Sequence, residues 1–286
     1  MVACPVLASE VMTGENWTQA TDHAAFSHKQ GHSTVIFNDT MWVIGGWAGD
    51  YSCPDDSCDA EIWYSSNGVN WTMGTKHAEF GGRYDQRSVV FDNKIWLIGG
   101  RNTTSWEPMN DVWSSSDGVS WTLVTDNASF SPRWDFGLTL FNDEMWLMGG
   151  SEDGPIQNDV WHSPDGVNWT LATDNASFSP RMDLTATTFK GKIWVTGGFD
   201  WRSHFNDSWC SDNGVNWTQV TDHASYPARR YHATAIADDK MWIIGGIGGA
   251  NPYNWQYLTD VWYSSNGTDW TETTSQAEFP GRYGFS

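Results

Sequence analysis

The stretch NDVWSSSDGVSWTLVTDNASFSPRWDFGLTLFNDEMWLMGG, residues 110–150, decides how this chain folds. The stretch NDVWHSPDGVNWTLATDNASFSPRMDLTATTFKGKIWVTGG, residues 158–198, is nearly a copy of it. Both halves of this unit recur in the same order from one end of the chain to the other. Such self-similarity indicates a structure built from copies of one small supersecondary element.

Three landmarks set the length of the repeat. The first is a Gly-Gly pair, the second is a Trp-Thr pair, and the third is a Trp shortly before each Gly-Gly pair. The Gly-Gly pairs end at Gly46, Gly100, Gly150, Gly198 and Gly246, with steps of 54, 50, 48 and 48 residues. A period near 50 residues is typical of one four-stranded propeller blade.

The first complete unit predicts four strands. They are HSTVIF at 32–37, MWVIGG at 41–46, EIWYSS at 61–66 and NWTMGT at 70–75. Asn38-Asp39 predicts a tight turn between the first two strands, and Asn67-Gly68 is typical of a type I′ hairpin turn between the last two. The second strand is almost entirely apolar, so we expect it to be buried on both faces. The same order repeats without any helical periodicity, which predicts antiparallel sheets.

The repeats cover nearly the whole chain and predict one domain, residues 1–286. Residues 31–272 hold five full repeats, and residues 1–30 and 273–286 supply parts of a further unit. In the first of these, Glu15 to Ala20 predicts an outer strand. We expect a six-bladed arrangement with an incomplete last blade, while five closed blades with overlapping ends, or a longer chain, stay open as alternatives.

The spaced Gly-Gly and aromatic positions resemble the Kelch repeat. The Gly-Gly doublet at the end of the second strand and aromatic residues such as Trp113 and Trp121 carry the resemblance, which covers roughly residues 14–286. Trp stands at 63, 113, 161, 209 and 262, where many Kelch repeats have Tyr. The resemblance implies an all-β fold: a Kelch-type β-propeller of four-stranded antiparallel blades, with five complete repeats and a partial sixth blade shared by the termini.

Charge and composition exclude several classes of partner. The formal net charge of −20 would repel phosphate, so nucleic acid is not an expected partner. No apolar run approaches the roughly 20 residues that a membrane helix needs, so we expect no membrane insertion. Met1 to Ala8 lacks the basic and long apolar regions of a signal peptide.

Cysteines and glycosylation sequons bear on the compartment. Cys53 and Cys58 bracket a short loop that a disulfide could close, while Cys4 and Cys210 cannot be paired from the sequence. The N-x-[ST] pattern occurs ten times, although four of these copies belong to the repeated NWT. A secreted or extracellular glycoprotein is therefore the expectation, with a cytoplasmic protein as the alternative.

A candidate ligand-binding surface is predicted on the propeller face that carries the variable links. Most of the 21 tryptophans occupy repeated strand positions and are expected in the core. Trp47, Trp106, Trp201 and Trp255 lie instead in the links between second and third strands. Exposed aromatic residues gathered on one face are typical of binding surfaces. The full candidate set is Trp47, Tyr51, Arg101, Trp106, Trp201, Arg202, Tyr253, Trp255 and Tyr257.

A second candidate set lies where the first strands enter the channel. Aligning the units places His32, Asp85, Asp135, Asp183 and His232 at one position, with Gly284 as the sixth. An arginine precedes most of them by two residues, at 83, 133, 181, 230 and 282. Such a ring could hold a cation or a polar ligand. Alternatively, each acid or imidazole pairs with a neighbouring Arg, and the ring satisfies the backbone at the blade junctions.

The function expected from these features is non-catalytic recognition of a protein or a glycan through the variable-link face. None of the common catalytic motifs occurs, and no metal or cofactor is expected. Sugar rings stack on Trp faces, so a glycan is one natural ligand. A monomeric domain is expected, and its being part of a longer chain stays open. The enzyme alternative is an isomerase similar to the Kelch-type sialic acid mutarotases, which would use the Arg, Asp and His residues at the channel mouth, with Arg230 among them.

Overall fold

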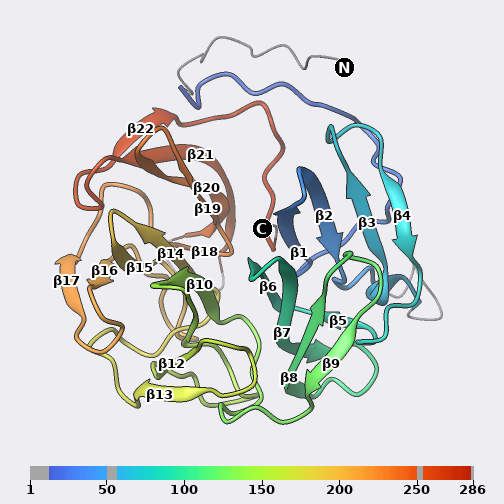
Figure 1. Ribbon diagram of the computed structural model, residues 1–286. Coiled ribbons are helices and arrows are strands. Elements are labelled where there is room, and N and C mark those ends of the chain that lie inside the picture. The colour runs from blue at the N-terminus through green and yellow to red at the C-terminus, as the bar shows by residue number, and fades with distance from the viewer. Residues whose placement is uncertain (1–12, 50–56, 250–253, 285–286) are drawn as a thin grey trace.

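A computed structural model describes residues 13–49, 57–249 and 254–284 of the chain. In these residues five antiparallel sheets of four main strands stand around a central axis as the blades of a β-propeller (Figure 1). No α-helix occurs in the described ranges, and the only helical turn there is the 3-10 helix η1 (Ser57–Ala60). The predicted all-β propeller fold is confirmed.

Each blade consists of consecutive strands in the order 1-2-3-4 from the axis outward. Blade 1 contains β1 (Ser33–Phe37), β2 (Thr40–Ile44), β3 (Ile62–Ser65) and β4 (Thr72–Thr75). Blade 2 contains β6 (Arg87–Phe91), β7 (Lys94–Asn102), β8 (Pro108–Ser115) and β9 (Thr122–Thr125). Blade 3 contains β10 (Gly137–Phe141), β11 (Glu144–Met148), β12 (Val160–Ser163) and β13 (Thr170–Thr173). Blade 4 contains β14 (Thr185–Phe189), β15 (Lys192–Thr196), β16 (Ser208–Ser211) and β17 (Thr218–Thr221). Blade 5 contains β19 (Ala233–Ala237), β20 (Lys240–Gly248), β21 (Gln256–Ser264) and β22 (Thr271–Thr274).

Two blades carry longer hairpins than the sequence predicts. β7 and β20 continue past their Gly-Gly pairs, and the short strands β5 (Arg83–Tyr84) and β18 (Arg229–Arg230) pair with these extensions. Much of the link predicted around Trp106 is therefore strand, with Arg101 opposite Pro108. The extended hairpins raise the ends of blades 2 and 5 on the face that carries the second-to-third links.

The turn assignments are partly corrected. Asn38 and Asp39 both have positive φ, at 51° and 55°, as a type I′ turn requires. The predicted type I′ turn at Asn67-Gly68 is wrong, because only Gly68 has a positive φ. There the Asn67 side-chain oxygen accepts the backbone N–H groups of Val69 and Asn70, which makes a wider loop before β4.

The expected partial sixth blade is not formed as a sheet. Residues Glu15 to Ala20 are not a strand, and neither end of the described chain adds a strand to a sheet. The ends lie instead between blades 5 and 1, where residues 275–284 run toward the axis and residues 13–30 pass along the outside (Figure 1). Near the axis, the first strands of consecutive blades pack on one another in the order β1, β6, β10, β14 and β19.

The blades interlock through a tryptophan of the second strand. Each indole is buried, and its Nε1 donates to a carbonyl five residues earlier at 2.9–3.3 Å. The ring then lies under the glycine of the next blade's outer turn. A Cβ on Gly166 would be 2.2 Å from Cζ3 of Trp96, so only glycine fits there. Trp42 with Gly118, Trp146 with Gly214, and Trp194 with Gly267 repeat this contact.

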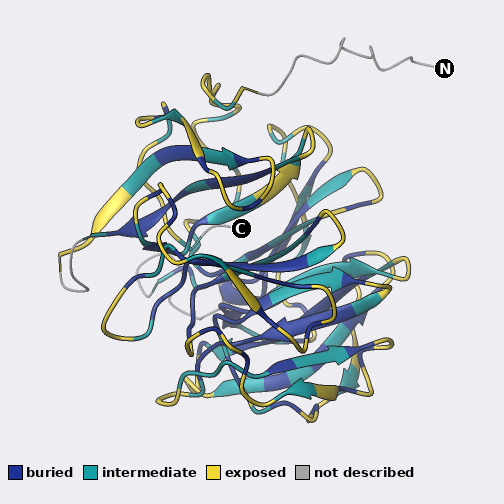
Figure 2. Cartoon of the chain, turned by 90° about the vertical axis from the view of Figure 1, so that its left-hand side faces the viewer, coloured by how far each residue is buried: buried dark blue, intermediate teal, exposed yellow. Residues whose placement is uncertain are grey.

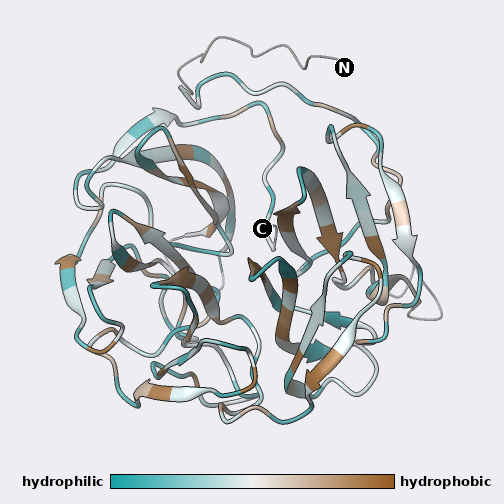
Figure 3. Cartoon of the chain, in the orientation of Figure 1, coloured by the Kyte–Doolittle hydropathy of each residue, from teal (hydrophilic) through white to brown (hydrophobic). Residues whose placement is uncertain are grey.

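A second aromatic contact joins the outer edges of the blades. The fourth-strand tryptophan stands edge-on to an aromatic ring of the preceding repeat, as in Phe130 and Trp169, whose centroids are 5.0 Å apart. The same pair recurs as Phe80–Trp121, Phe178–Trp217 and Tyr226–Trp270. The buried residues thus form layers between adjacent sheets (Figure 2). Hydrophobic residues gather on inner strands such as β6 and β7 (Figure 3).

Substitution of the turn glycine tests this interlock. Gly166 and Gly191 have the same φ of 72°, but an added Cβ at Gly191 would meet nothing within 4 Å. We expect Gly191→Ala to cost about 1–2 kcal/mol of unfolding free energy from backbone strain alone. Gly166→Ala should cost about 1–3 kcal/mol more, because the new methyl group overlaps Trp96. Urea unfolding measures both, and equal losses would contradict the interlock.

Candidate functional site

The link face carries both candidate sets of residues. Links between second and third strands leave the sheet at the same end at which the first strands begin. Residues Asp85, Asp135 and Asp183, which precede first strands, are therefore close to the axis on the face where the aromatic links rise. The site has a buried polar centre and an aromatic rim.

Four arginines that precede the first strands form buried ion pairs inside their own blades. Arg83, Arg133, Arg181 and Arg229 each donate through both terminal nitrogens to Asp111, Asp159, Asp207 and Asp260, at 2.6–2.8 Å. Each also donates to the carbonyl of the first glycine of a Gly-Gly pair at 2.9–3.0 Å. The same carboxylates accept the Nε1–H of the third-strand tryptophans. Lys29 and Glu61 take these two places in blade 1.

These pairs correct the predicted partnership at the channel mouth. The repeated arginines do serve the backbone, as the structural interpretation expects, but their carboxylate partners are on the third strands. The partner could have been found in the sequence, because an acid stands two residues before every third-strand tryptophan. Arg230, which the alignment placed in this series, is one residue out of register; Arg229 occupies the position.

A belt of backbone hydrogen bonds surrounds the axis. The N–H of Asp85 donates to the carbonyl of Gly31, and the same bond links Asp135 to Asp85, Asp183 to Asp135, and Tyr231 to Asp183, at 2.8–3.2 Å. The Gly31 N–H in turn donates to Gly284 at 3.0 Å. All six residues have φ between 54° and 62°. This left-handed conformation suits Gly and Asp far better than Tyr.

The belt shows that two predicted ring members are misplaced. Gly31 and Tyr231 hold the equivalent positions, and His32 and His232 follow them by one residue. Asp85, Asp135, Asp183 and Gly284 are placed as predicted. The sequence alignment matched polar residue types, whereas the backbone register is fixed by the distance to each first strand.

The three belt aspartates form a carboxylate cluster of Asp85, Asp135 and Asp183. All are buried. The Tyr231 hydroxyl donates to Asp135 at 2.9 Å, and Arg230 Nη1 donates to Asp183 at 3.2 Å. Arg87 Nη2 lies 3.8 Å from Asp135. Arg230, although out of register, therefore does reach the predicted ring.

Burial makes the charged form of this cluster costly. It raises the pKa of Asp85 to about 7, which Arg87 partly opposes. Burial and the charge of Asp85 raise the pKa of Asp135 to about 7. The pKa of Asp183 is raised well above its ordinary value by burial, and then by Asp135. Near neutral pH the cluster thus holds both protons and negative charge.

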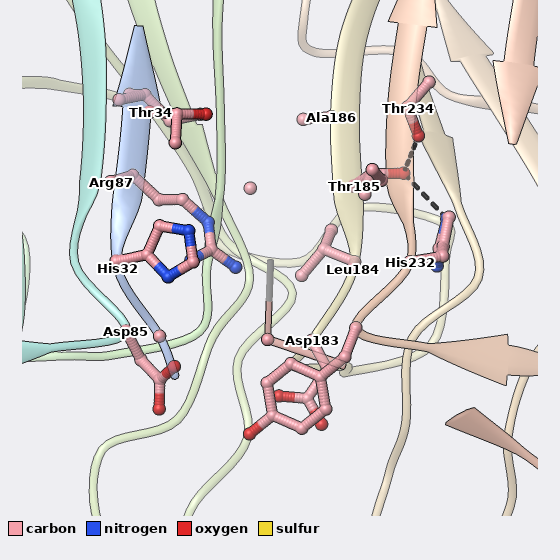
Figure 4. A pocket seen from close by; sticks show the side chains of 16 residues that line it. His32, Thr34, Asp85, Arg87, Asp183, Leu184, Thr185, Ala186, His232 and Thr234 are labelled. Carbon is pink, nitrogen blue, oxygen red and sulfur yellow. Dashed lines mark hydrogen bonds between the residues drawn. The ribbon is translucent and has the colours of Figure 1, made fainter. Parts of the chain in front are cut away.

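A cavity of about 260 Å³ lies along the inner strands beside this cluster. Figure 4 shows Asp85, Asp183, His32 and His232 around it, with the Thr34 and Thr234 side chains farther along the strands. His232 Nε2 is 2.9 Å from the Thr185 hydroxyl. Burial lowers the pKa of His32 to about 4 and that of His232 to about 3, so both imidazoles are neutral. In the described part of the chain, no three His, Cys, Asp or Glu side chains are arranged to hold a metal ion.

The first aromatic cluster consists of Trp47, Tyr84, Trp106 and Trp134, with Arg101. Trp106 stands edge-on to Trp47 at 5.9 Å and to Tyr84 at 6.0 Å. The Arg101 guanidinium lies 5.3 Å from the Trp134 ring and donates to Asp153 at 2.9 Å. Trp47 is half-buried beneath this arrangement, whereas Trp106 is 44% exposed.

The second aromatic cluster consists of Phe199, Trp201, His204, Arg230 and Trp255. Arg230 lies between two rings, 4.2 Å from Phe199 and 5.2 Å from Trp255. Trp201 stands edge-on to Phe199 at 6.0 Å. Trp201 and Trp255 are 49% and 54% exposed. Arg230 thus joins the aromatic rim to the carboxylate cluster.

The remaining predicted residues lie at the margins. Arg202 is exposed, and its backbone N–H donates to Asp200. Tyr257 is exposed and stacks on Tyr283 at 5.6 Å. Tyr51, Tyr253 and Cys53 lie outside the described residues, as does the side chain of Cys58, so the disulfide stays a prediction. Tyr84, Trp134 and Phe199 were not predicted as site residues. Tyr84 and Trp134 lie where the chain approaches a first strand, and Phe199 directly follows a Gly-Gly pair.

Comparison with known proteins gives no family assignment: no protein-family model matches the chain, and no curated protein matches it. Among the described residues there is no helix long and apolar enough to cross a membrane. The fold and the two-part site therefore rest on the chain's own geometry, and the compartment stays a prediction.

The carboxylate cluster should govern part of the pH dependence of stability. A carboxyl whose pKa is raised on folding contributes stability that is full below its ordinary pKa and is lost as the pH rises through about 7. Asp135→Asn keeps an acceptor for Tyr231 and removes this titration. We expect the variant to lose about 1–3 kcal/mol less unfolding free energy than the parent between pH 4 and 8. Urea unfolding across this range measures the difference.

The buried histidines act in the opposite direction. Their pKa values are lowered on folding, so their contribution is lost as the pH falls below about 6.5. Both histidines are present in the parent and in Asp135→Asn, so their contribution to the pH dependence of stability cancels when the two proteins are compared. Parallel pH profiles for the parent and Asp135→Asn would show that the cluster does not titrate in this way.

Proposed function

We propose that this chain is a Kelch-type propeller that acts as a recognition module and binds a glycan through the tryptophans of its link face. The observation that carries the proposal is the backbone of Trp106 and Trp201. Both have positive φ, at 62° and 72°, in loops where glycine would be unstrained. A bulky residue in this conformation is uncommon and costs stability, and such strain gathers at functional sites.

The loops themselves do not require an indole. Around Trp106, the Asn102 side chain accepts the backbone N–H groups of Thr104 and Ser105 at 2.8–2.9 Å. Around Trp201, the Asp200 side chain likewise accepts hydrogen bonds from the backbone N–H groups of Arg202 and Ser203, at 2.7–3.0 Å. These side-chain hydrogen bonds shape both turns independently of the aromatic ring, so its exposure supports a role in binding.

The distribution of the exposed rings over several links favours a glycan over a flat protein surface. Trp106, Trp201 and Trp255 belong to three different links, and charged side chains such as Arg101, Asp153 and Asp200 lie in or beside these links. Sugar rings need one aromatic face for each contact and several polar partners around it. The net charge of −20 favours a neutral glycan over an anionic one.

Glycine substitution at the two strained positions tests the proposal. Trp106→Gly and Trp201→Gly should change the melting temperature little, because glycine adopts these φ values freely and this relief offsets the lost edge-on ring contacts. The double variant should lose at least tenfold in affinity on an array of neutral glycans. Val167→Gly, at an exposed residue of an outer turn on the other face, is the matched control and should bind normally.

Two outcomes would contradict this function. If the double variant unfolds more readily than the parent, the indoles serve the fold. If the parent binds no glycan but its link face captures a protein in a Trp106-dependent way, the alternative protein-recognition function is correct.

The isomerase alternative concerns the channel instead of the rim. The cavity lined by Asp85, Asp183 and His232 is the observation that favours it. Arg230, however, is occupied by Asp183 and two aromatic rings. Anomer exchange of sialic acid, followed by NMR with and without the protein, tests this function; Asp183→Asn should abolish any acceleration if the channel is responsible.

A further inference from the structure

A cavity of about 510 Å³ lies between blade 5 and two segments near the ends of the described chain. One wall is Ala233 of β19 and Ile244 of β20. The other walls come from Trp17 to Thr21 and from residues 278–282. In Figure 1 residues 275–284 run between blades 5 and 1; we call this sector the wedge, and the cavity is the part of it beside blade 5.

The outer wall of the wedge reproduces the contacts between blades. A Cβ on Gly14 would be 2.6 Å from Trp242 Cζ3, which is the indole–glycine contact of the other blades. Trp17 stands edge-on to Phe279 at 5.2 Å, as each fourth-strand tryptophan does to the preceding repeat. The backbone N–H of Trp17 donates to the Glu278 carboxylate at 3.1 Å, as the backbone N–H of Trp121 does to the Glu79 carboxylate.

The belt also has room for six blades. Gly284 supplies its sixth position and accepts from Gly31, although only five sheets are present in the described chain. The outermost turn and the axial residue of a sixth repeat are thus in place. The strands that would lie between them are not among the described elements.

Blade 1 is not covered by any described sheet on the side that faces the wedge. Ile36 of β1 is 64% exposed. Its equivalent in blade 4, Thr188, is half-buried and donates to a carbonyl of the preceding inner strand. Among the described residues no indole lies against Gly68, and an added Cβ there would first meet Met41 at 3.4 Å. The glycines of the other outer turns each cover a tryptophan.

Arg282 supplies the polar feature of the wedge. It stands two residues before the belt, as do Arg83, Arg133, Arg181 and Arg229. Those four are buried and bound to third-strand aspartates. Arg282 is exposed at the wedge and has no ion pair within the described ranges. A segment that fills the wedge is therefore expected to bring a carboxylate to it.

We propose that the wedge is a docking site for a three-stranded β-meander of the repeat's own pattern, supplied by a partner chain. The first strand would carry small and apolar residues against Ala233 and Ile36. The second would carry a tryptophan beneath Gly68 and end in Gly-Gly. The third would carry an acid for Arg282. The blade-to-blade surfaces already present define each of these requirements, so the partner's chemistry follows from the walls.

A peptide of residues 136–163 tests the proposal, because it contains β10, β11 and β12 of blade 3, including Trp146 and Asp159. Fluorescein-labelled peptide should bind the whole protein by anisotropy and raise its melting temperature. A scrambled peptide is the control. Ala235→Glu, on the exposed wedge side of β19, should abolish binding while leaving the fold intact, because the residue is exposed.

The ion pair gives a sharper arm. Arg282→Ala in the protein and Asp159→Asn in the peptide should each weaken binding by roughly ten- to a hundredfold. Combined, they should weaken it no more than either alone, because both remove one interaction. Fully additive losses would show that Arg282 and the peptide acid do not meet.

A fusion protein is a second test, which remains valid if the isolated peptide does not fold in solution. Residues 136–163 joined after Gly284 should raise the melting temperature, and the Asp159→Asn fusion should raise it less. Absence of binding and of stabilisation in both formats would overturn the proposal. It would also be overturned if sedimentation showed a dimer that Ala235→Glu dissociates, since a second copy would then be the occupant.

Discussion

The structure depends on the contact between an indole and the glycine that covers it. In each of four junctions, the second-strand tryptophan of one blade lies under the outer-turn glycine of the next. The contact needs a flat ring on one side and the absence of a Cβ on the other. It therefore fixes both the distance and the order of neighbouring sheets, and it uses the same two residue types throughout the chain.

Two sets of polar interactions, the buried arginine–aspartate pairs and the backbone belt, also hold the sheets in place. Buried arginines in blades 2 to 5, and Lys29 in blade 1, bind the third strand to the segment before the first, so each sheet is tied across its width. A pair of this kind adds little net stability when intact, but losing one partner leaves a buried charge, which costs about 3–5 kcal/mol. Around the axis, the backbone belt joins one sheet to the next. Sheet, junction and axis thus each have a separate restraint, and the link face is free to vary.

Much of this arrangement was predictable, and the failures have specific causes. The period of the Gly-Gly and Trp-Thr pairs predicted the sheets and their order, because these residues contribute directly to packing. The predicted ring at the channel mouth was wrong at His32 and His232. The repeats were aligned by matching polar side chains, and this match is offset by one residue from the backbone register at these two places. The outer strand at Glu15–Ala20 was also wrong. Its sequence matches the repeat, but a strand needs a hydrogen-bonding partner, and no described third strand lies beside it. For the aromatic rim, the exposed tryptophans of the links were predicted from the sequence. The contributions of Tyr84 and Trp134 were not, because these rings join the rim only through contacts between residues of different blades.

The belt has a consequence for how the molecule assembles and opens. Almost every contact described above joins neighbours in sequence, so sheets can accrete one after another along the chain, as in other repeat proteins. Contacts such as the bond between Gly31 and Gly284 and that between Trp17 and Glu278 are different, because they span nearly the whole polypeptide and can form only after the row is complete. Within the described residues, blades 1 and 5 each have a neighbouring sheet on one side only, and they depend on these late contacts. Local opening should begin at these two blades, and amide hydrogens should exchange with solvent there before they do so in blade 3.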